Sequence, residues 1–325
     1  MKKKTGGFPQ TLHDAIKYFS NEENAFNFIK AIRWPDGVVK CPTCGSAKLS
    51  FLSTRKLWKC KNAHAKQQFS VKVGTVLEDS AITLDKWLCA FWLIVNAKNG
   101  ISSYELHRAI GVTQKTAWFM LQRIRLAMQQ GSIEKMKGRV EADETFIGGL
   151  ARNMHKSKKK HLGTGGAGKV AVMGLLERNA PDGGSRVRCK VVPNVRRGAL
   201  DPAVRQNVET GSEVITDAFP SYESLSDAYV HQVIDHAECY AKDHVHTNGL
   251  ENFWSLLKRA LKGTYVNVEP FHLFRYLDEQ AFRFNERKEN DAGRFVKALR
   301  GITGKGLRYA KLIGGDGIQQ AWQAT

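Results

Sequence analysis

The sequence predicts a mixed α/β protein in which small N-terminal modules precede a larger unit, a mixed sheet flanked by helices. Three observations support this fold class. A chain of 325 residues is too long for one typical core. Three cysteines and a histidine cluster between residues 41 and 64, and the apolar spacing changes from helical to strand-like near residue 139. The hydrophobic fraction of 42% is that of a folded chain.

The charge of the chain is strongly positive. Lys and Arg outnumber Asp and Glu by 50 to 31, which gives a net charge of +19. A polyanionic partner is expected, nucleic acid before membrane. The excess of positive charge is concentrated in residues 151–200, which contain twelve Lys and Arg and only two acidic residues. Within this stretch, Lys158, Lys159 and Lys160 are candidate DNA contacts. The alternative is a solvated basic loop.

Membrane and export signals are not evident in the sequence. The longest apolar run, "WLCAFWLIV" at 87–95, is half the length of a membrane span and fits a buried helix. The basic N-terminus leads into no apolar segment. We expect a soluble cytoplasmic protein, associated with the nucleoid if its partner is DNA, with no membrane partner.

The clustered cysteines predict a zinc ribbon over residues 38–76, after an N-terminal helical segment at 1–37. Two cysteines two apart on a tight turn can occupy adjacent corners of a zinc tetrahedron. The predicted ligands of a structural Zn²⁺ ion are Cys41, Cys44, Cys60 and His64. A ribbon that folds by packing alone is the alternative. The isolated cysteines Cys89, Cys189 and Cys239 are expected to be small buried side chains.

A helix-turn-helix is predicted within residues 77–135. The segment "SSYELHRAIGVTQKTAWFMLQRIRLAM" predicts one helix, a turn at Gly111 and a second helix that starts near Thr113. In a DNA-binding pair the start of the second helix enters the major groove. The candidate DNA contacts are Thr113, Gln114, Lys115, Trp118 and Arg123, with Arg125 further along. An ordinary helical hairpin in a core would have the same pattern.

The mixed sheet is predicted within residues 136–290, with 291–325 as a C-terminal tail. Strand-like runs ended by Gly or Pro occupy the first half of this unit, and helix then alternates with strand. The expected strands are 139–149, 168–178, 185–195, 212–219 and 229–235, and the expected helices are 199–208, 248–262 and 269–287.

Three acidic residues of this unit form a candidate metal site. Asp143 lies in the first strand, Asp217 ends a later strand and Glu251 lies on a helix. Carboxylates from two strands and one helix can converge on two Mg²⁺ or Mn²⁺ ions, which would stabilise the attacking and leaving oxygens of a phosphoryl transfer. Taken singly, each acid could be a solvent or turn residue. Glu144 points to the other face of the strand and one of this pair is expected in solvent, whereas Glu141 shares the face of Asp143.

The helix predicted at 248–262 carries an apolar arc beside a polar stripe that includes Glu251, Lys258 and Lys262. Its glutamate could reach the metal site and its lysines could contact DNA phosphate. A merely solvated face is the alternative. His246 and Asn248 are candidate assistants at the active site. A second metal site made by His231, His236, Cys239, His244 and His246 is conceivable, but loop roles are preferred.

The segments "CPTCGS", "FSVKVGT", "EADETFIGG", "ITDAFPSY" and "HTNGLENFWSLLKRALKGTY" together resemble bacterial insertion-sequence transposases related to the Merlin group. The similarity spans roughly residues 20–290 and rests on the joint order of these segments. It implies a zinc ribbon followed by a ribonuclease-H-like DDE domain. It also implies that Asp143, Asp217 and Glu251 are the catalytic triad and Lys258 the basic residue that follows it.

The resemblance implies Mg²⁺-dependent cleavage at the element ends, followed by transfer of the 3′-hydroxyl into target DNA. The expected partners are terminal inverted repeats, target DNA and a second copy of the chain, as a homodimer or larger synaptic complex. Some relatives have asparagine in the third acidic role, which leaves Asn248 as a rival to Glu251. His64 stands where a cysteine is usual. A DNA-binding regulator, such as a domesticated transposase, and a plain two-metal nuclease remain alternative functions.

Overall fold

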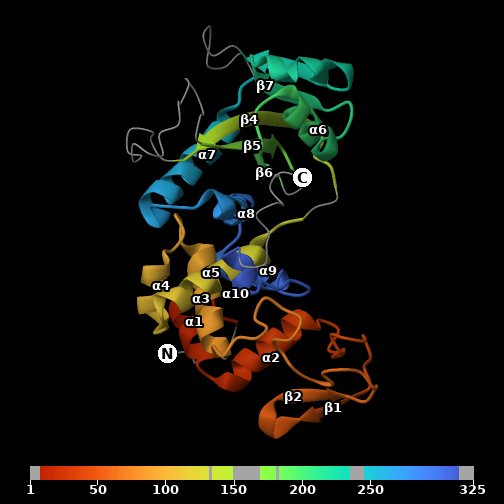
Figure 1. Cartoon of the computed structure of the whole chain (residues 1–325), viewed down its shortest axis with the longest axis vertical. Helices are drawn as coiled ribbons and strands as arrows, with labels where there is room; N and C mark the ends of the chain where they lie inside the picture. The colour runs from red at the N-terminus through yellow and green to blue at the C-terminus, as the bar shows by residue number, and fades with distance from the viewer. Residues whose placement is uncertain (1–7, 132–133, 149–168, 181–182, 235–244, 315–325) are drawn as a thin grey trace, which may run out of the picture. The chain divides into compact units, whose positions relative to one another are not determined.

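The structure is a computed structural model that describes residues 8–131, 134–148, 169–180, 183–234 and 245–314 (Figure 1). The chain divides into two compact units, residues 1–129 with 289–325, and residues 130–288. The chain therefore leaves the first unit to form the second and then returns to the first. Within the described ranges, no helix is long and apolar enough to cross a membrane.

The first unit begins with two capped helices. Helix α1 (Leu12–Phe19) starts after Thr11, whose side chain accepts a hydrogen bond from the amide of Asp14. Helix α2 (Glu22–Arg33) starts after Asn21, whose side chain accepts from the amides of Glu23 and Asn24. Such caps satisfy amides that the first helical turn leaves without a backbone partner. The helical segment predicted before the cysteine cluster is thus present.

The helical core of the first unit is built around α3 (Leu84–Asn96), which contacts α1, α2, α4, α5 and α9. Its apolar run is buried, as the sequence predicts. Helix α9 (Asp291–Arg300) lies in the stretch expected to be a tail, and it packs on α3 instead. The ring of Phe295 is fully buried and lies 5.0 Å from that of Trp92. The apolar spacing of Phe295, Ala298 and Leu299 on a capped helix was the missed signal.

Helices α4 (Ser103–Ile110) and α5 (Gln114–Met128) follow α3 and pack against each other. Ser102 and Glu105 form a reciprocal capping box at the start of α4. Gly111 ends α4 in the left-handed region with φ of 62°, a conformation that glycine adopts without steric cost. The short α10 (Tyr309–Leu312) completes the described helices of this unit.

The cysteine module contains a small antiparallel sheet in the order β1-β2-β3. Its strands are β1 (Leu49–Leu52), β2 (Leu57–Cys60) and β3 (Gln68–Ser70). Trp58 on β2 is buried and stacks on Phe26 of α2, with ring centroids 5.5 Å apart. The ribbon is therefore attached to the N-terminal helices by aromatic packing.

The second unit is a five-stranded mixed sheet in the order β6-β5-β4-β7-β8. The first three strands in sequence are antiparallel neighbours, and β7 and β8 add in parallel beside β4. All five predicted strands are present, as β4 (Arg139–Ile147), β5 (Val170–Glu177), β6 (Arg186–Val192), β7 (Glu213–Asp217) and β8 (Val230–Ile234).

Helices cover both faces of this sheet. One face packs against α6 (Arg197–Asn207) and the 3₁₀ segment η4 (Pro220–Asp227), around a core that includes Val140, Leu200 and Tyr222. The other face packs against α7 (Asn248–Ala260) and α8 (Leu273–Asn285). Figure 1 shows α7 running beside β4 and β5, the two strands that it contacts. The mixed sheet between helices is the predicted fold class.

Candidate active site and metal centre

The register of two parallel strands places Asp143 and Asp217 side by side. Glu141 of β4 pairs with Ile215 of β7, so the residues two positions further on, Asp143 and Asp217, lie at the same level of neighbouring strands and on the same face. Both carboxyl groups lie near the end of the parallel pair, where functional groups of such sheets collect. Tertiary structure thus joins two acids that are far apart in sequence.

Glu251, the third predicted acid, lies on α7, the helix that also contacts Asp143 through Trp254. Helix α7 buries Leu250, Phe253, Trp254 and Leu257 against the sheet and leaves Glu251 exposed at its edge. The pKa of Asp143 is raised to about 6, mainly by burial and also by the negative charges of Asp217 and Glu251, although hydrogen bonds from Trp254 and Glu144 lower it. The three predicted acids therefore form one electrostatically coupled group.

Trp254 links α7 directly to Asp143. Its indole Nε1 donates a hydrogen bond of 2.9 Å to Oδ2 of Asp143. The indole reaches this position because Gly174 lies opposite Asp143 on β5 and has no side chain. A Cβ atom at Gly174 would lie 2.6 Å from Cζ2 of Trp254 and 2.9 Å from Cδ2 of Leu250. Gly174 is therefore a site residue that the sequence pattern did not reveal.

Glu144 lies on the opposite face of β4 from Asp143, as alternation predicts, but neither residue is a solvent residue. Both side chains are only partly accessible, and the hydroxyl of Tyr222 donates a hydrogen bond to Glu144 Oε1. Burial, with the charges of Asp143 and Asp217, raises the pKa of Glu144 to about 8. The expectation that one of this acidic pair faces solvent was wrong, because η4 covers the second face.

Glu141, the acid that shares a face with Asp143, is fully buried. Its two carboxylate oxygens are engaged separately, Oε1 by Nε of Arg178 at 2.6 Å and Oε2 by the backbone N–H of Leu250 at 2.8 Å. Strand spacing alone could not separate Glu141 from Asp143. The structure separates them, because Glu141 is buried and paired with the half-buried guanidinium of Arg178.

The other predicted catalytic residues lie along or just before α7. His246 is half-buried and its Nδ1 lies 2.7 Å from Nη2 of Arg178. Asn248 begins α7, and Lys258 lies two turns after Glu251; both side chains are exposed. Lys262 is also exposed but lies beyond α7, in the π-helical turn Leu261–Tyr265. The lysines are thus available to a phosphate backbone.

The predicted zinc ligands converge in the first unit. The ligand atoms of Cys41, Cys44, Cys60 and His64 all lie within 4.8 Å of one another. The Sγ atoms of Cys44 and Cys60 are 3.6 Å apart, and Sγ of Cys41 lies 3.4 Å from Nε2 of His64. In a tetrahedral zinc site with Zn–S bonds of about 2.3 Å and Zn–N bonds of about 2.0 Å, neighbouring ligand atoms lie roughly 3.5 to 3.8 Å apart. The two distances given above are close to these values, so the cluster suits a structural Zn²⁺ ion.

Hydrogen bonds with neighbouring groups orient His64 and favour ionisation of Cys41. His64 Nδ1 lies 2.7 Å from the carbonyl oxygen of Ala65, an outer contact that orients the ring so that Nε2 faces the cysteines. Burial opposes ionisation of Cys41, but hydrogen bonds from the amides of Cys44 and Thr43 lower the pKa of its thiol to about 7. His64, the ligand that departs from the usual cysteine, is therefore well placed.

The predicted DNA contacts on α5 differ in their availability. Thr113 caps the helix by accepting a hydrogen bond from the amide of Thr116, and its side chain is exposed. Lys115 is exposed, with its ammonium 4.7 Å from the ring centroid of Tyr309. Gln114 is half-buried and donates to Ser103 Oγ, and Trp118 is also half-buried. The start of α5 therefore presents polar groups at its surface.

Arg123 is not available as a DNA contact. Its side chain is buried, Nε donates to the carbonyl oxygen of Leu307 at 3.1 Å, and Nη1 donates to that of Glu78 at 2.6 Å. Arg125 is also buried. Both arginines fall on the core side of α5, so we remove them from the DNA-contacting set. Lys158, Lys159 and Lys160 lie outside the described residues.

The residues considered for a second metal site do not form one where the structure describes them. His231 on β8 contacts Oγ1 of Thr216 at 3.0 Å, and burial lowers its pKa. His246 contacts Arg178 instead. His236, Cys239 and His244 lie outside the described residues.

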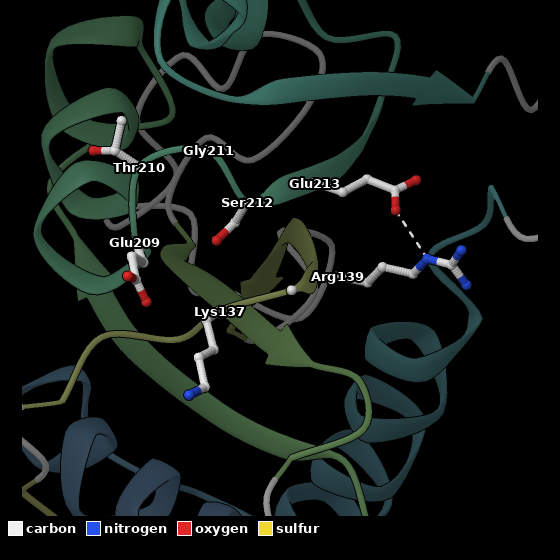
Figure 2. Close-up of a pocket in the computed structure, with 8 residues that line it drawn as sticks. Lys137, Arg139, Glu209, Thr210, Gly211, Ser212 and Glu213 are labelled. Atoms are coloured by element: carbon white, nitrogen blue, oxygen red, sulfur yellow. Dashed lines mark hydrogen bonds and ion pairs between the residues drawn. The ribbon is translucent and has the colours of Figure 1, made fainter.

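A hollow of about 440 Å³ lies at the opposite end of β4 and β7 from Asp143 and Asp217 (Figure 2). It is lined by the turns before these strands, and Arg139 Nε lies 2.9 Å from Oε2 of Glu213 across it. Figure 2 shows Lys137 pointing away from that ion pair. This hollow does not include Asp143, Asp217 or Glu251.

The fold and the cysteine cluster together identify a class of protein. It is a zinc-ribbon protein whose second unit is consistent with a ribonuclease-H-like sheet. Residues 135–285 match the model of the ISXO2-like transposase domain, and residues 20–65 match that of the transposase zinc-ribbon domain. The chain therefore belongs to the transposases, and it carries an ISXO2-like transposase domain and a transposase zinc ribbon.

Two relatives agree with this assignment. The chain is 28% identical over 259 residues to an uncharacterized protein in transposable element ISH50 of Halobacterium salinarum, a match covering 76% of this chain and 85% of the relative. It is 38% identical over 118 residues to an uncharacterized transposase-like protein of Haemophilus influenzae, covering 35% of this chain and 95% of the relative. The resemblance to insertion-sequence transposases is confirmed.

Proposed function

We propose that this chain is an active DDE transposase that cleaves DNA at the ends of its element and joins the freed 3′-hydroxyl to target DNA. The observation that carries the proposal is the coupling of three carboxylates, Asp143, Asp217 and Glu251, on neighbouring parallel strands and the adjoining helix. The transposase-domain match covers all three residues. The net charge of +19 supports a nucleic-acid substrate.

The donor set fits divalent cations that prefer oxygen ligands. Three carboxylates that repel one another, and that raise the pKa of Asp143, are stabilised when a cation is held among them. Two Mg²⁺ or Mn²⁺ ions held there would supply Lewis-acid stabilisation to the attacking and leaving oxygens. Asp143 and Asp217 provide ligands from rigid strands, whereas Glu251 provides one from α7.

Glu251 is favoured over Asn248 as the third ligand. The negative charge of Glu251 helps to raise the pKa of Asp143, which supports Glu251 as the third ligand. Asn248 lies at the first position of α7, before the segment that packs on the sheet. Lys258 and Lys262 lie further along and would contact DNA phosphates, while His246 would remain near the start of α7.

The first unit is proposed to bind the terminal inverted repeats. Cys41, Cys44, Cys60 and His64 would hold a structural Zn²⁺ ion, as their spacing supports. Thr113, Gln114, Lys115 and Trp118 would contact DNA from the start of α5. Joining two element ends requires at least two active sites, so the proposal includes a homodimer or larger assembly on DNA.

The test is a cleavage assay with labelled element-end DNA and Mg²⁺. Wild-type protein is expected to cut at the end, whereas Asp143→Asn and Asp217→Asn lose at least about 100-fold in rate, because a metal ligand is removed. Glu209→Gln is the matched control, an exposed carboxylate at the other end of the sheet, and should cut like wild type. Cleavage that survives both aspartate substitutions would overturn the active-site assignment.

Two further results separate the alternatives. Specific binding to the repeats without any Mg²⁺-dependent cutting would identify a DNA-binding regulator instead. Addition of a target plasmid distinguishes a transposase from a plain nuclease, since only the transposase produces joined molecules. Glu251→Gln and Asn248→Ala, compared in the same assay, identify the third ligand by which substitution abolishes cutting.

A further inference from the structure

The start of α7 is fastened to the sheet by a buried ion pair that the proposed chemistry does not use. Glu141 is 1% exposed, and Arg178, at the end of β5, is 14% exposed. Nε of Arg178 donates to Oε1 of Glu141, while Oε2 of Glu141 accepts from the backbone N–H of Leu250. Leu250 immediately precedes Glu251, so the hydrogen bond from Leu250 to Glu141 lies next to the third proposed metal ligand.

Arg178 extends the same contact to the segment before α7. Its Nη2 lies 2.7 Å from Nδ1 of His246 and also donates to the backbone carbonyl of His246. One guanidinium therefore connects β4 to the chain entering α7, while the carboxylate that it pairs with holds the first helical turn. A lysine has one donor centre and cannot make both contacts in this geometry.

Glu141 is unsuited to be a metal ligand itself. Both of its oxygens are occupied, and a guanidinium cation lies 2.6 Å from one of them. A divalent cation placed there would be repelled by Arg178 and would have to displace a buried ion pair. The pair instead acts on the position of α7, which also carries Trp254, the hydrogen-bond donor to Asp143.

Gly249 completes the contact. A Cβ atom at this position would lie 2.8 Å from both Oε1 and Oε2 of Glu141, closer than nonbonded atoms approach. Glycine inside a helix is otherwise unfavourable relative to alanine. The close approach of the helix backbone to Glu141 explains why glycine occupies this position.

We propose that Glu141, Arg178 and Gly249 form a positioning latch that sets where Glu251 lies relative to Asp143 and Asp217, and thereby sets the affinity of the active site for divalent metal. This inference rests on the proposed function. It adds residues that touch neither the metal nor DNA, and it assigns to Glu141 a role distinct from that of its neighbour Asp143.

The test measures Mn²⁺ binding by the zinc-loaded full chain, without DNA, through the loss of the free Mn²⁺ signal in electron paramagnetic resonance. Gly249→Ala should weaken binding by about 10- to 100-fold, the range typical of outer-shell changes. Gly198→Ala is the matched control. Gly198 is also the second residue of a helix, α6, but a Cβ there meets nothing within 4 Å. That variant should bind Mn²⁺ like wild type.

Two substitutions in the ion pair supply independent readouts. Glu141→Gln keeps the shape but removes the negative charge that pairs with Arg178 Nε, and Arg178→Lys keeps the positive charge but loses the second contact. Both should weaken Mn²⁺ binding and speed hydrogen exchange at the amide of Leu250, while the thermal unfolding of the first unit stays unchanged. A merely structural role would alter thermal stability and leave the metal affinity of the folded protein intact.

Each outcome has a distinct meaning. Wild-type protein with no Mn²⁺ site sensitive to Asp143→Asn would overturn the proposed function, and this inference with it. A wild-type Mn²⁺ site that Gly249→Ala, Glu141→Gln and Arg178→Lys all leave unchanged in the folded protein would overturn the latch alone. If Gly198→Ala weakens binding as much as Gly249→Ala, the contact with Glu141 is not the cause and the latch is also rejected.

Discussion

Replacement of Asp143 by Asn should make the metal-free protein more stable at neutral pH while it removes activity. In the folded protein the pKa of Asp143 is raised from 3.8 to about 6, first by burial and then by the charges of Asp217 and Glu251. Asn has nearly the same shape and carries no charge, so it resembles the protonated form of Asp143. The substitution therefore removes the unfavourable interactions of a buried charge.

The magnitude follows from this pKa difference. A carboxyl group with a higher pKa in the folded state binds its proton more tightly there than in the unfolded chain. The wild-type protein therefore loses stability as the pH rises from about 4 to about 6, and the full penalty is present above pH 6. A shift of roughly two pKa units corresponds to about 3 kcal/mol. Oδ1 and Oδ2 of Asp143 accept from the Glu144 amide and the Trp254 indole, and the NH2 group of Asn cannot accept, so the variant also loses one hydrogen bond at every pH. The stability of Asp143→Asn relative to wild type should therefore rise by about 3 kcal/mol between pH 4 and pH 7.5.

The assay is urea unfolding of the full chain at several pH values without added Mg²⁺. Pulsed hydrogen exchange read on peptides of β4 and β5 follows the unit that contains Asp143. Glu209→Gln, at the opposite end of the sheet, should show no pH-dependent gain. A stability difference between Asp143→Asn and wild type that does not grow between pH 4.5 and pH 7.5 would refute the reasoning.

Four other substitutions test the remaining assignments. Gly174→Ala should destabilise the second unit by about 1–3 kcal/mol, because the added methyl overlaps Trp254, and unfolding curves would contradict this if they were unchanged. Cys60→Ala should unfold the ribbon and abolish tight Zn²⁺ binding, measured by metal analysis; a fully folded, zinc-loaded variant would disprove the ligand set. Arg123→Ala should lower the melting temperature of the first unit. Lys115→Ala should weaken DNA binding and leave that melting temperature unchanged. The reverse pattern in melting and DNA-binding curves would show that Arg123 is the DNA contact.

Much of the fold could be predicted because its signals are local. The strands of the second unit have apolar runs that end in Gly or Pro, and all five were found close to their predicted bounds. Gly111 marked the end of α4 because a left-handed conformation is costly for other residues. Helix α9 was missed because its partners, α3 and α5, lie far away in the sequence. Its pattern alone did not distinguish a tail from a packed helix.

The candidate active site could be predicted only in part from the sequence. The sequence indicated Asp143, Asp217 and Glu251, but it could not separate Glu141 from Asp143, since alternation places both on one face of β4. Burial and an ion pair with Arg178 separate them. Likewise, the position of Arg123 within α5 does not say that it points into the core.

The sequence by itself indicated an order of modules, the candidate zinc ligands and the candidate acidic residues, because spacing along a turn, strand or helix limits which side chains can act together locally. Only the tertiary structure shows which acidic side chains interact electrostatically with one another and which one pairs with an arginine. That outcome depends on the parallel register of β4 with β7 and on the contact of α7 with Glu141, Asp143 and Gly174. Register and helix docking are set by packing between distant segments, and no local pattern encodes them.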